Sequence, residues 1–174
     1  MAAVDPALHW HETLRDGTRV LIRPIQKEDA PLEWAFLERL SVGSRANRFH
    51  GEVRVSDVLV RRLTDVDLAR DMAFVALRHD AGEKKEIGVS RFCVGDAGDS
   101  CECAITVSDE WQGRGLGTLL MRHLIEVARG RGIKQMIAIV AVGNLAMCNL
   151  AASLGFAPES MRDYPGEIVY RLRL

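Results

Sequence analysis

Three glycines at alternate positions stand directly before a leucine-rich segment in the stretch WQGRGLGTLL, residues 111–120. Glycine destabilises the interior of a helix or a strand, so three of them close together carry a cost in stability. The apolar residues that follow recur at the spacing of one helix face; they are Leu116, Leu119, Leu120, Leu124, Ile125 and Ala128. The stretch therefore predicts a tight loop that opens a helix and whose backbone must stay free of side chains.

A glycine loop at the start of a helix is typical of an anion site. The N–H groups of the first turn have no partner within the helix, and the helix dipole is positive there. Glycine lets phosphate oxygens approach these N–H groups closely. We therefore expect a phosphate or diphosphate at residues 112–118, and a tight turn without any ligand is the alternative.

Two common phosphate loops fit this sequence poorly. A Walker loop ends in Gly-Lys-Ser/Thr, and the chain contains no such run. The dinucleotide fingerprint has a third glycine where this chain has Thr118, and it follows an early strand of a parallel sheet. A nucleotide-binding module that shares only a glycine loop stays open as one hypothesis.

The rest of the chain alternates between strand and helix patterns. Strands are expected at residues 19–25, 72–77, 87–94, 101–107, 133–140 and 168–174. Helices are expected at residues 28–40, 56–63, 116–128 and 144–154, whereas residues 41–49 are polar and predict an irregular segment. Turns at 80–82 and 96–99 join three strands into an antiparallel meander. The order β-α-α-β-β-β-α-β-α-β predicts one α/β (α+β) domain, residues 1–174, with a mixed, mostly antiparallel central sheet flanked by helices.

Composition and charge exclude several function classes. The formal net charge is -1 and the Lys and Arg residues form no block, so we expect no nucleic-acid partner. The N-terminus lacks a signal-peptide pattern and the apolar run 136–142 is too short for a bilayer, so we expect a cytoplasmic protein without a membrane contact. Its cysteines should then stay reduced. Cys101 and Cys103 share a strand face without a paired Cys or His motif, which favours core packing over a metal site.

The loop from Gln112 to Gly117 matches the pattern Gln/Arg-x-x-Gly-x-Gly/Ala and resembles the acyl-CoA loop of the GNAT N-acetyltransferase superfamily. Asn144 after the next strand and Leu-Gly-Phe at 154–156 extend this resemblance, as does the order of elements. The stretches LRDGTRVLIRPIQKED, LSVGSRANRF, LTDVD and ECAITVSDEWQGRGLG are similar to the acetyltransferase domain of bacterial Pat-type protein lysine acetyltransferases. The resemblance implies the GNAT fold and direct transfer of an acetyl group from acetyl-CoA to a primary amine. A protein lysine is the first hypothesis for this amine, and a small molecule is the second.

The resemblance also implies a catalytic residue. Glu102, in the sequence Glu-x-Ala, would act as the general base that removes a proton from the amine. We expect the neighbouring Cys103 and Ala104 to shield its carboxylate from water. A backbone N–H near Val107 would stabilise the negative charge that develops on the thioester oxygen.

The remaining expected site residues would hold the acetyl-CoA. The pantetheine arm would pair with the backbone of Ile105, Thr106 and Val107, and Asn144 would either bind the arm or only cap the last helix. The diphosphate would bind the residues of the loop: Gln112, Gly113, Arg114, Gly115, Leu116, Gly117 and Thr118.

One departure from the family pattern leaves an alternative open. Many members carry a tyrosine seven residues after the asparagine, which protonates the leaving thiolate, and this chain has Ala151 there. Tyr164 is a candidate substitute, although a packing role also fits it. The missing tyrosine favours a second hypothesis, a non-catalytic acyl-CoA-binding sensor or regulatory domain. The oligomeric state stays open, with a homodimer as one alternative.

Overall fold

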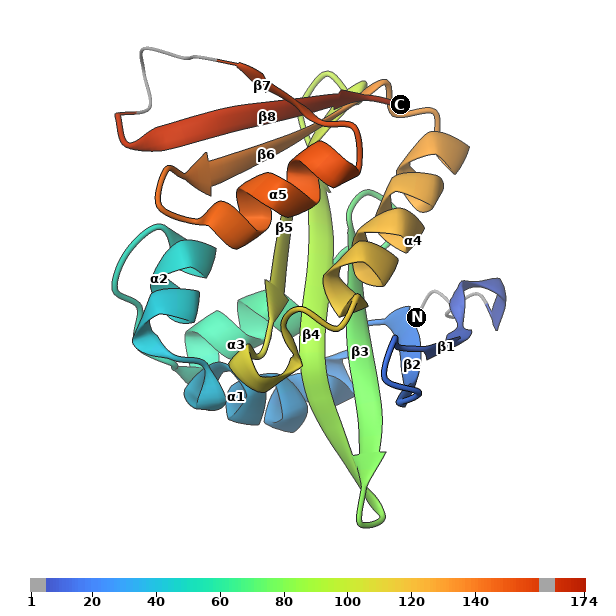
Figure 1. Cartoon of the computed structure of the whole chain (residues 1–174). Helices are drawn as coiled ribbons and strands as arrows, with labels where there is room; N and C mark the ends of the chain where they lie inside the picture. The colour runs from blue at the N-terminus through green and yellow to red at the C-terminus, as the bar shows by residue number, and fades with distance from the viewer. Residues whose placement is uncertain (1–5, 160–164) are drawn as a thin grey trace.

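An 8-stranded sheet forms the centre of the molecule in the computed structural model, which describes residues 6–159 and 165–174 (Figure 1). The strand order is β1-β2-β3-β4-β5-β6-β8-β7, and every neighbouring pair is antiparallel except β5 and β6. The strands are β1 (Trp10–Thr13), β2 (Arg19–Pro24), β3 (Met72–Asp80), β4 (Glu83–Val94), β5 (Ser100–Val107), β6 (Gln135–Ala141), β7 (Ala157–Glu159) and β8 (Glu167–Arg173). The expected mixed, mostly antiparallel sheet is confirmed.

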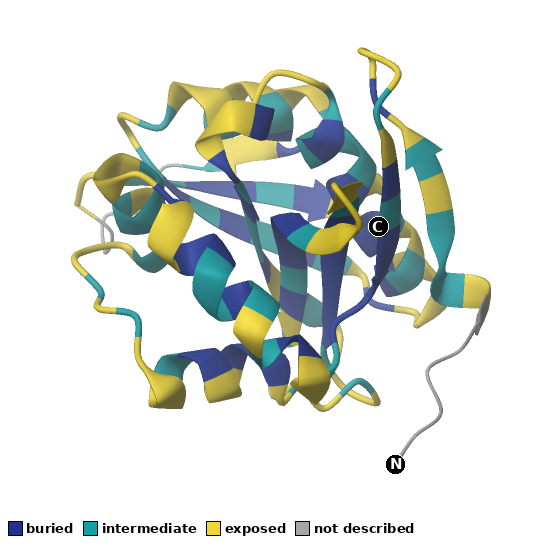
Figure 2. Ribbon diagram, turned by 90° about the horizontal axis from the view of Figure 1, so that it is seen from below, coloured by how far each residue is buried: buried dark blue, intermediate teal, exposed yellow. Residues whose placement is uncertain are grey.

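Helices cover both faces of this sheet, and Figure 2 shows the strands as the buried layer between them. The helices are α1 (Ala30–Arg39), α2 (Val42–Phe49), α3 (Asp57–Thr64), α4 (Leu116–Gly130) and α5 (Leu145–Ser153), with short turns η1 (Pro6–Leu8), η2 (Lys27–Asp29) and η3 (Asp109–Trp111). One apolar core lies under α4 and α5, and a second lies under α1 and α3. None of the described helices is long and apolar enough to cross a membrane.

The central strand β3 is buried on both faces, as its uninterrupted apolar run predicted. Met72, Phe74 and Ala76 belong to the core beneath α4, whereas the alternate residues Ala73, Val75 and Leu77 belong to the core beneath α1 and α3. Side chains of a strand point to opposite faces in turn, so burial on both faces requires apolar residues throughout. The antiparallel meander of β3, β4 and β5 is confirmed.

Three elements differ from the sequence predictions. Residues 42–49 form helix α2, so the expected irregular segment was wrong. The Ser41 side chain accepts a hydrogen bond from the Ser44 backbone, 3.1 Å away, which caps this helix although few of its residues are apolar. Strands β1 and β7 were missed because they are short edge strands of four and three residues, too short for an alternating pattern to appear.

The sheet opens between β5 and β6, and this opening positions the site. The parallel pairing of these strands is confined to Ser100, Cys101 and Glu102 on β5, opposite residues 135–137 on β6. β5 remains paired with β4 as far as Val107. In Figure 1, β6 and β8 cross the top of the molecule at a steep angle to β3 and β4. Beyond Glu102, β5 therefore has one free edge.

Candidate active site

A cavity of about 720 Å³ lies in the opening between β5 and β6, and it extends to α2, α5 and the glycine loop. The structure brings most of the expected site residues together on its wall. These are Glu102, Ile105, Thr106, Val107, Gln112, Gly113, Gly115, Gly117, Thr118 and Asn144. Of the other two, Leu116 packs its side chain into the core and Arg114 points elsewhere.

The glycine loop presents a row of free backbone donors to this cavity. Gly113 and Gly115 have φ angles of 73° and 92°, a left-handed conformation that other residues rarely adopt. No residue in the described ranges accepts a hydrogen bond from the backbone N–H groups between Gly113 and Thr118. Because α4 begins here, the positive end of its dipole adds to these donors. The loop therefore has free donors that can bind an anion.

A different arginine from the expected one reaches this loop. The Arg114 guanidinium lies 2.6 Å from Asp16 and 4.7 Å from the ring centre of Trp111, and Arg114 does not line the cavity. Hydrogen bonds from Thr18 and then from Arg114 lower the pKa of Asp16 to about 2, so this carboxylate stays ionised. Arg15 lines the cavity instead, with its Nε 3.5 Å from where a Cβ on Gly115 would stand. Sequence reasoning missed Arg15 because the hairpin that carries it is far from the loop along the chain.

Along β5, the backbone N–H and C=O groups of successive residues point alternately toward β4 and into the opening. The Ser108 N–H donates to the Ile87 carbonyl of β4 at 3.0 Å, so the backbone groups of Ser108 and Thr106 point toward β4. Those of Val107 and Ile105 then point into the opening. This alternation narrows the expected pantetheine contacts from three residues to Ile105 and Val107.

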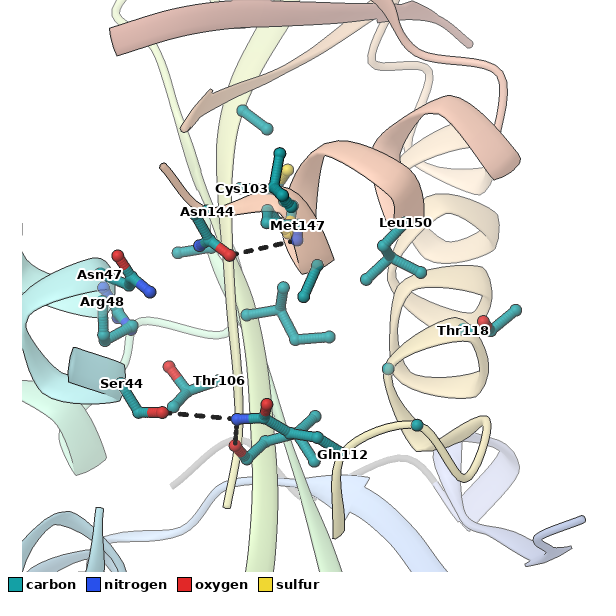
Figure 3. A pocket seen from close by; sticks show the side chains of 18 of the residues that line it. Ser44, Asn47, Arg48, Cys103, Thr106, Gln112, Thr118, Asn144, Met147 and Leu150 are labelled. Atoms are coloured by element: carbon teal, nitrogen blue, oxygen red, sulfur yellow. Dashed lines mark hydrogen bonds between the residues drawn. The ribbon is translucent and has the colours of Figure 1, made fainter. Parts of the chain in front are cut away.

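Gln112 ties the loop to β5 and α2. Its side-chain amide donates to the Val107 carbonyl at 3.1 Å and to Ser44 Oγ at 3.4 Å (Figure 3). The expected phosphate contact of Gln112 therefore competes with two contacts inside the protein. Its position on the wall shapes the cavity beside the end of β5.

Glu102 is the last residue of β5 that pairs with β6, and its side chain is exposed. The expected shielding by Cys103 was wrong, because successive strand residues point to opposite faces and Cys103 is buried in the core beneath α4. Glu102 instead shares its face with Cys93, its partner on β4. The carboxylate therefore faces the open cavity rather than an apolar pocket.

Arg48 of α2 brings a positive charge to the same cavity wall. Burial lowers the pKa of Arg48 to about 10, and the charge of Arg91 adds to this effect. Nearby acidic groups, Glu102 among them, act in the opposite direction. Arg48 therefore stays protonated at neutral pH although it is partly removed from water.

Asn144 caps α5 and also lines the cavity. Its Oδ1 accepts a hydrogen bond from the Met147 backbone at 3.2 Å (Figure 3). The cap uses only the carbonyl oxygen, and no described residue accepts from the side-chain N–H₂. The capping and ligand-binding roles are therefore compatible.

The described cavity wall contains no tyrosine that could protonate a leaving group. Ala151 is fully buried in the core, and Tyr164 lies outside the described residues. Tyr170 lies off the cavity wall, and a hydrogen bond with Cys148 raises the pKa of its hydroxyl.

The cysteines of β5 belong to the apolar core beneath α4. Burial raises the pKa of the Cys101 thiol to about 12, and it also raises the pKa of Cys103. No group of three or more potential metal ligands occurs within the described residues.

The chain is similar in sequence and structure to known acetyltransferases. A family model described as the acetyltransferase (GNAT) family matches residues 52–156. A Pseudomonas aeruginosa protein named as an acetyltransferase is 44% identical over 167 residues, which cover 95% of this chain and 90% of that protein. The acetyltransferase Pat of Mycolicibacterium smegmatis is 30% identical over 157 residues, and the match covers 81% of this chain but only 46% of Pat. The crystal structure of the GNAT domain of S. lividans PAT superposes with a TM-score of 0.88 at 29% identity, covering 97% of this chain and 98% of that domain.

Proposed function

Because the chain belongs to the GNAT family of acetyltransferases, which use acetyl-CoA, we propose that its cavity binds acetyl-CoA and passes the acetyl group directly to a primary amine. One observation carries the proposal. The free N–H groups from Gly113 to Thr118 stand beside the free edge of β5, so one ligand can bind both. A diphosphate joined to an extended amide-containing arm has the chemistry that this pair of surfaces recognises.

The residues present fit each part of acetyl-CoA. The diphosphate would accept hydrogen bonds from the loop amides, with Arg15 as an additional positive charge. The pantetheine arm would pair with Ile105 and Val107 as an added strand, and Asn144 would donate to one of its amides. The thioester would then lie beyond Ile105 on the side toward Glu102, within the same cavity.

The reaction requires an unprotonated amine. Alkyl ammonium groups lose a proton only near pH 10, so a base must take it at neutral pH. Glu102 would accept this proton, directly or through a water molecule. The amine nitrogen then forms a bond to the thioester carbon, the free N–H of Ile105, which lies nearer Glu102 along β5 than that of Val107, stabilises the oxyanion, and the carbon–sulfur bond breaks.

The departing thiolate needs little help. Thiols have pKa values of about 8.5, so the thiolate is a stable leaving group and recovers its proton from solvent. The products are the N-acetylated amine, CoA and one proton. Holding the two reactants together contributes about 7–11 kcal/mol in well-oriented systems. Positioning by the cavity therefore supplies much of the expected acceleration without a tyrosine.

The acceptor is the less defined half of the proposal. The resemblance to Pat-type domains supports a protein lysine first and a small amine second. The chain spans less than half of the Mycolicibacterium Pat, so the activity of that whole protein is not transferred to this chain.

Release of CoA from acetyl-CoA tests the proposed function. The protein is incubated with acetyl-CoA and a panel of lysine peptides, free amino acids and simple alkyl amines, and the free thiol is measured. We expect amine-dependent thiol release together with an N-acetylated product by mass spectrometry. Failure of every amine to increase thiol release would contradict the proposal.

A further inference from the structure

Arg48 is a partly desolvated cation without a partner. Other shielded arginines here have at least one partner: Arg23 forms a 2.7 Å ion pair with Asp29, and Arg91 donates through one terminal nitrogen to the Leu63 carbonyl. No described residue forms an ion pair with Arg48 or accepts a hydrogen bond from it, and its recorded contact is the Phe49 ring, 5.0 Å away. A shielded charge with free donors is unfavourable unless something pairs with it. The wall of the cavity therefore has an unused anion-binding group.

Helix α2 is fixed so that this group faces the cavity. The Asp109 carboxylate accepts hydrogen bonds from the Ser41 backbone and from the hydroxyls of Ser41 and Ser44, at 2.7–3.0 Å. These hydrogen bonds outweigh the partial burial of Asp109 and lower its pKa, so the anchor is ionised at neutral pH. Figure 3 shows Ser44, Asn47 and Arg48 on the side of α2 that faces β5.

A second unused donor lies on the opposite wall. Thr106 is 7% exposed, and no described residue hydrogen-bonds to its hydroxyl. Its side chain points from β5 toward α2 (Figure 3). Buried hydroxyl groups normally have a partner, so this orphan is a second, independent sign of an absent ligand group between α2 and β5.

The charges on this side of the cavity complement an acceptor that carries both signs. Glu102 and Arg48 attract each other but form no ion pair. The reacting amine is expected at Glu102, so an anionic group close to that amine would meet Arg48. Arginine donors match the two oxygens of a carboxylate, which is the anion that amino acids and acidic side chains carry close to an amine.

We propose that Arg48, together with the Thr106 hydroxyl, binds a carboxylate that the acceptor carries next to its reacting amine. This inference rests on the proposed function. The carboxylate has two sources, the α-carboxylate of a free amino acid or an acidic side chain beside a lysine in a peptide. Acceptors without it leave Arg48 unpaired and react more slowly.

Matched acceptors test this subsite. One series pairs free α-amino acids with their primary amides, and the other pairs Asp-Lys and Glu-Lys peptides with their Asn-Lys and Gln-Lys counterparts. Wild type, Arg48→Gln and Arg45→Gln are compared by thiol release. Arg45 is a half-buried arginine of the same helix that does not line the cavity, so its variant controls for loss of charge on α2.

In at least one series, we expect wild type to favour the carboxylate member by about 10- to 100-fold in kcat/KM, as for a hydrogen bond to a charged group. Arg48→Gln should abolish this preference, mainly through KM, whereas Arg45→Gln should keep it. The series that shows the preference identifies the source of the carboxylate. N-acetyl-amino acids and N-acetyl-lysine peptides are reaction products that do not react further, so calorimetry measures their binding alone. Their Kd should rise in Arg48→Gln.

Two results would overturn the inference. Wild type could use neutral and carboxylate acceptors equally well. Arg48→Gln could slow both members of a pair to the same extent, which would make Arg48 structural or a positioning residue for Glu102. Turnover of amines without a carboxylate preference would refute the inference alone, whereas absence of turnover with every acceptor would refute the proposed function as well.

Discussion

Glu102 occupies the point at which two neighbouring strands separate. It is the last residue of β5 paired with β6, and the cavity begins at this position. A carboxylate at the apex of the opening is exposed in the free protein and would be covered by the acceptor and the thioester once both are bound. The strand topology therefore positions the proposed base, because Glu102 lines the cavity while β5 is still paired on both edges.

Replacing Glu102 by Gln keeps the shape of the side chain and removes its basicity. We expect kcat/KM for amines to fall by about 10²–10⁴-fold, the usual contribution of a general base. The Kd for CoA should not change, because the proposed CoA contacts lie on the loop and farther along β5. Steady-state thiol release and calorimetry with CoA measure the two effects.

Glu126→Gln, on an exposed position of α4, is the matched control and should retain full activity. Unchanged turnover in Glu102→Gln would remove Glu102 as the base. Loss of CoA affinity in that variant would instead indicate a binding role.

At the scale of elements, two segments distant in sequence form the proposed diphosphate site. The glycine loop supplies backbone donors, and the β1–β2 hairpin supplies Arg15, which lines the cavity, and Asp16, which pairs with Arg114. The Arg15 N–H also donates to the Arg114 carbonyl at 3.4 Å, which joins the hairpin to the loop. The hairpin therefore fixes Arg114 through Asp16, whereas its own Arg15 is positioned to bind the proposed ligand.

Arg15→Gln should raise the Kd for CoA about 10-fold, since a hydrogen bond to a charged group is lost. Arg114→Gln, the paired control, loses an exposed ion pair with Asp16 and should change the Kd little. Neither variant should alter binding of acetyl-pantetheine, which has no diphosphate. Calorimetry with both ligands decides the matter, and an equal effect of the two variants on CoA would contradict this assignment.

Helix α1 and strand β4 hold two buried carboxyl groups against each other. Glu33 and Glu86 are each 1% exposed, and their side chains have no other hydrogen-bond partner among the described residues. Burial, followed by the charge of Glu33 and a hydrogen bond with it, raises the pKa of Glu86 well above its usual value. Asp29 of η2 adds to the shift and Arg91 of β4 opposes it.

Because of the Glu33–Glu86 pair, we expect the free energy of unfolding to fall as pH rises. The folded protein binds the Glu86 proton more tightly than the unfolded chain, so the free energy of unfolding decreases above the unfolded pKa, by up to about 1.4 kcal/mol per pH unit. Glu86→Gln removes this proton and should flatten the decline between about pH 5 and about pH 8. Urea unfolding at several pH values across that range measures the free energy of unfolding of both proteins.

Glu38→Gln, at an exposed position of α1, should follow the wild-type pH dependence. Parallel curves for wild type and Glu86→Gln would contradict the assignment of the decline to this carboxyl pair.

The sequence predicted elements whose pattern is local and missed those that depend on distant partners. The buried strand β3 is predicted by its continuous apolar run, and the helix α4 by apolar residues at helical spacing. Helix α2 has no buried residue, and its anchor is Asp109, far along the chain. Arg15 and Arg48 were missed for the same reason, because only the folded sheet brings them to the loop and to β5.

At the scale of the whole molecule, the sheet consists of two parts that meet at a short junction. β1 to β5 form one part and β6, β8 and β7 form the other, joined by the pairing of residues 100–102 with 135–137. The sequence predicted one mixed sheet, but the separation of β5 from β6 depends on how far the pairing extends, which no local pattern encodes.

A second connection joins the end of α2 to the start of β8. His50 Nδ1, at the end of α2, lies 2.6 Å from Glu167 Oε1, at the start of β8. This contact joins the α2 side of the cavity to the part of the sheet that contains β8. Because His50 also lines the cavity, the tie bounds the space available to the acceptor.

Removing this tie with Glu167→Ala should loosen α2 without unfolding the protein. The free energy of unfolding should fall by less than about 1 kcal/mol, as for other partly exposed ion pairs. Amide hydrogen exchange of residues 42–49 should become faster, as measured by mass spectrometry. Glu159→Ala, which removes the Arg171 contact in the same part of the sheet, should leave that exchange unchanged. Equal exchange of α2 in wild type and Glu167→Ala would refute a role for the tie.

The crystal structure of the complex with CoA tests the central claim most directly. We predict that the diphosphate oxygens lie within hydrogen-bond distance of the N–H groups between Gly113 and Thr118, and that the arm pairs with Ile105 and Val107 in the opening between β5 and β6. CoA bound at another surface, or a diphosphate that makes no contact with these N–H groups, would contradict the account.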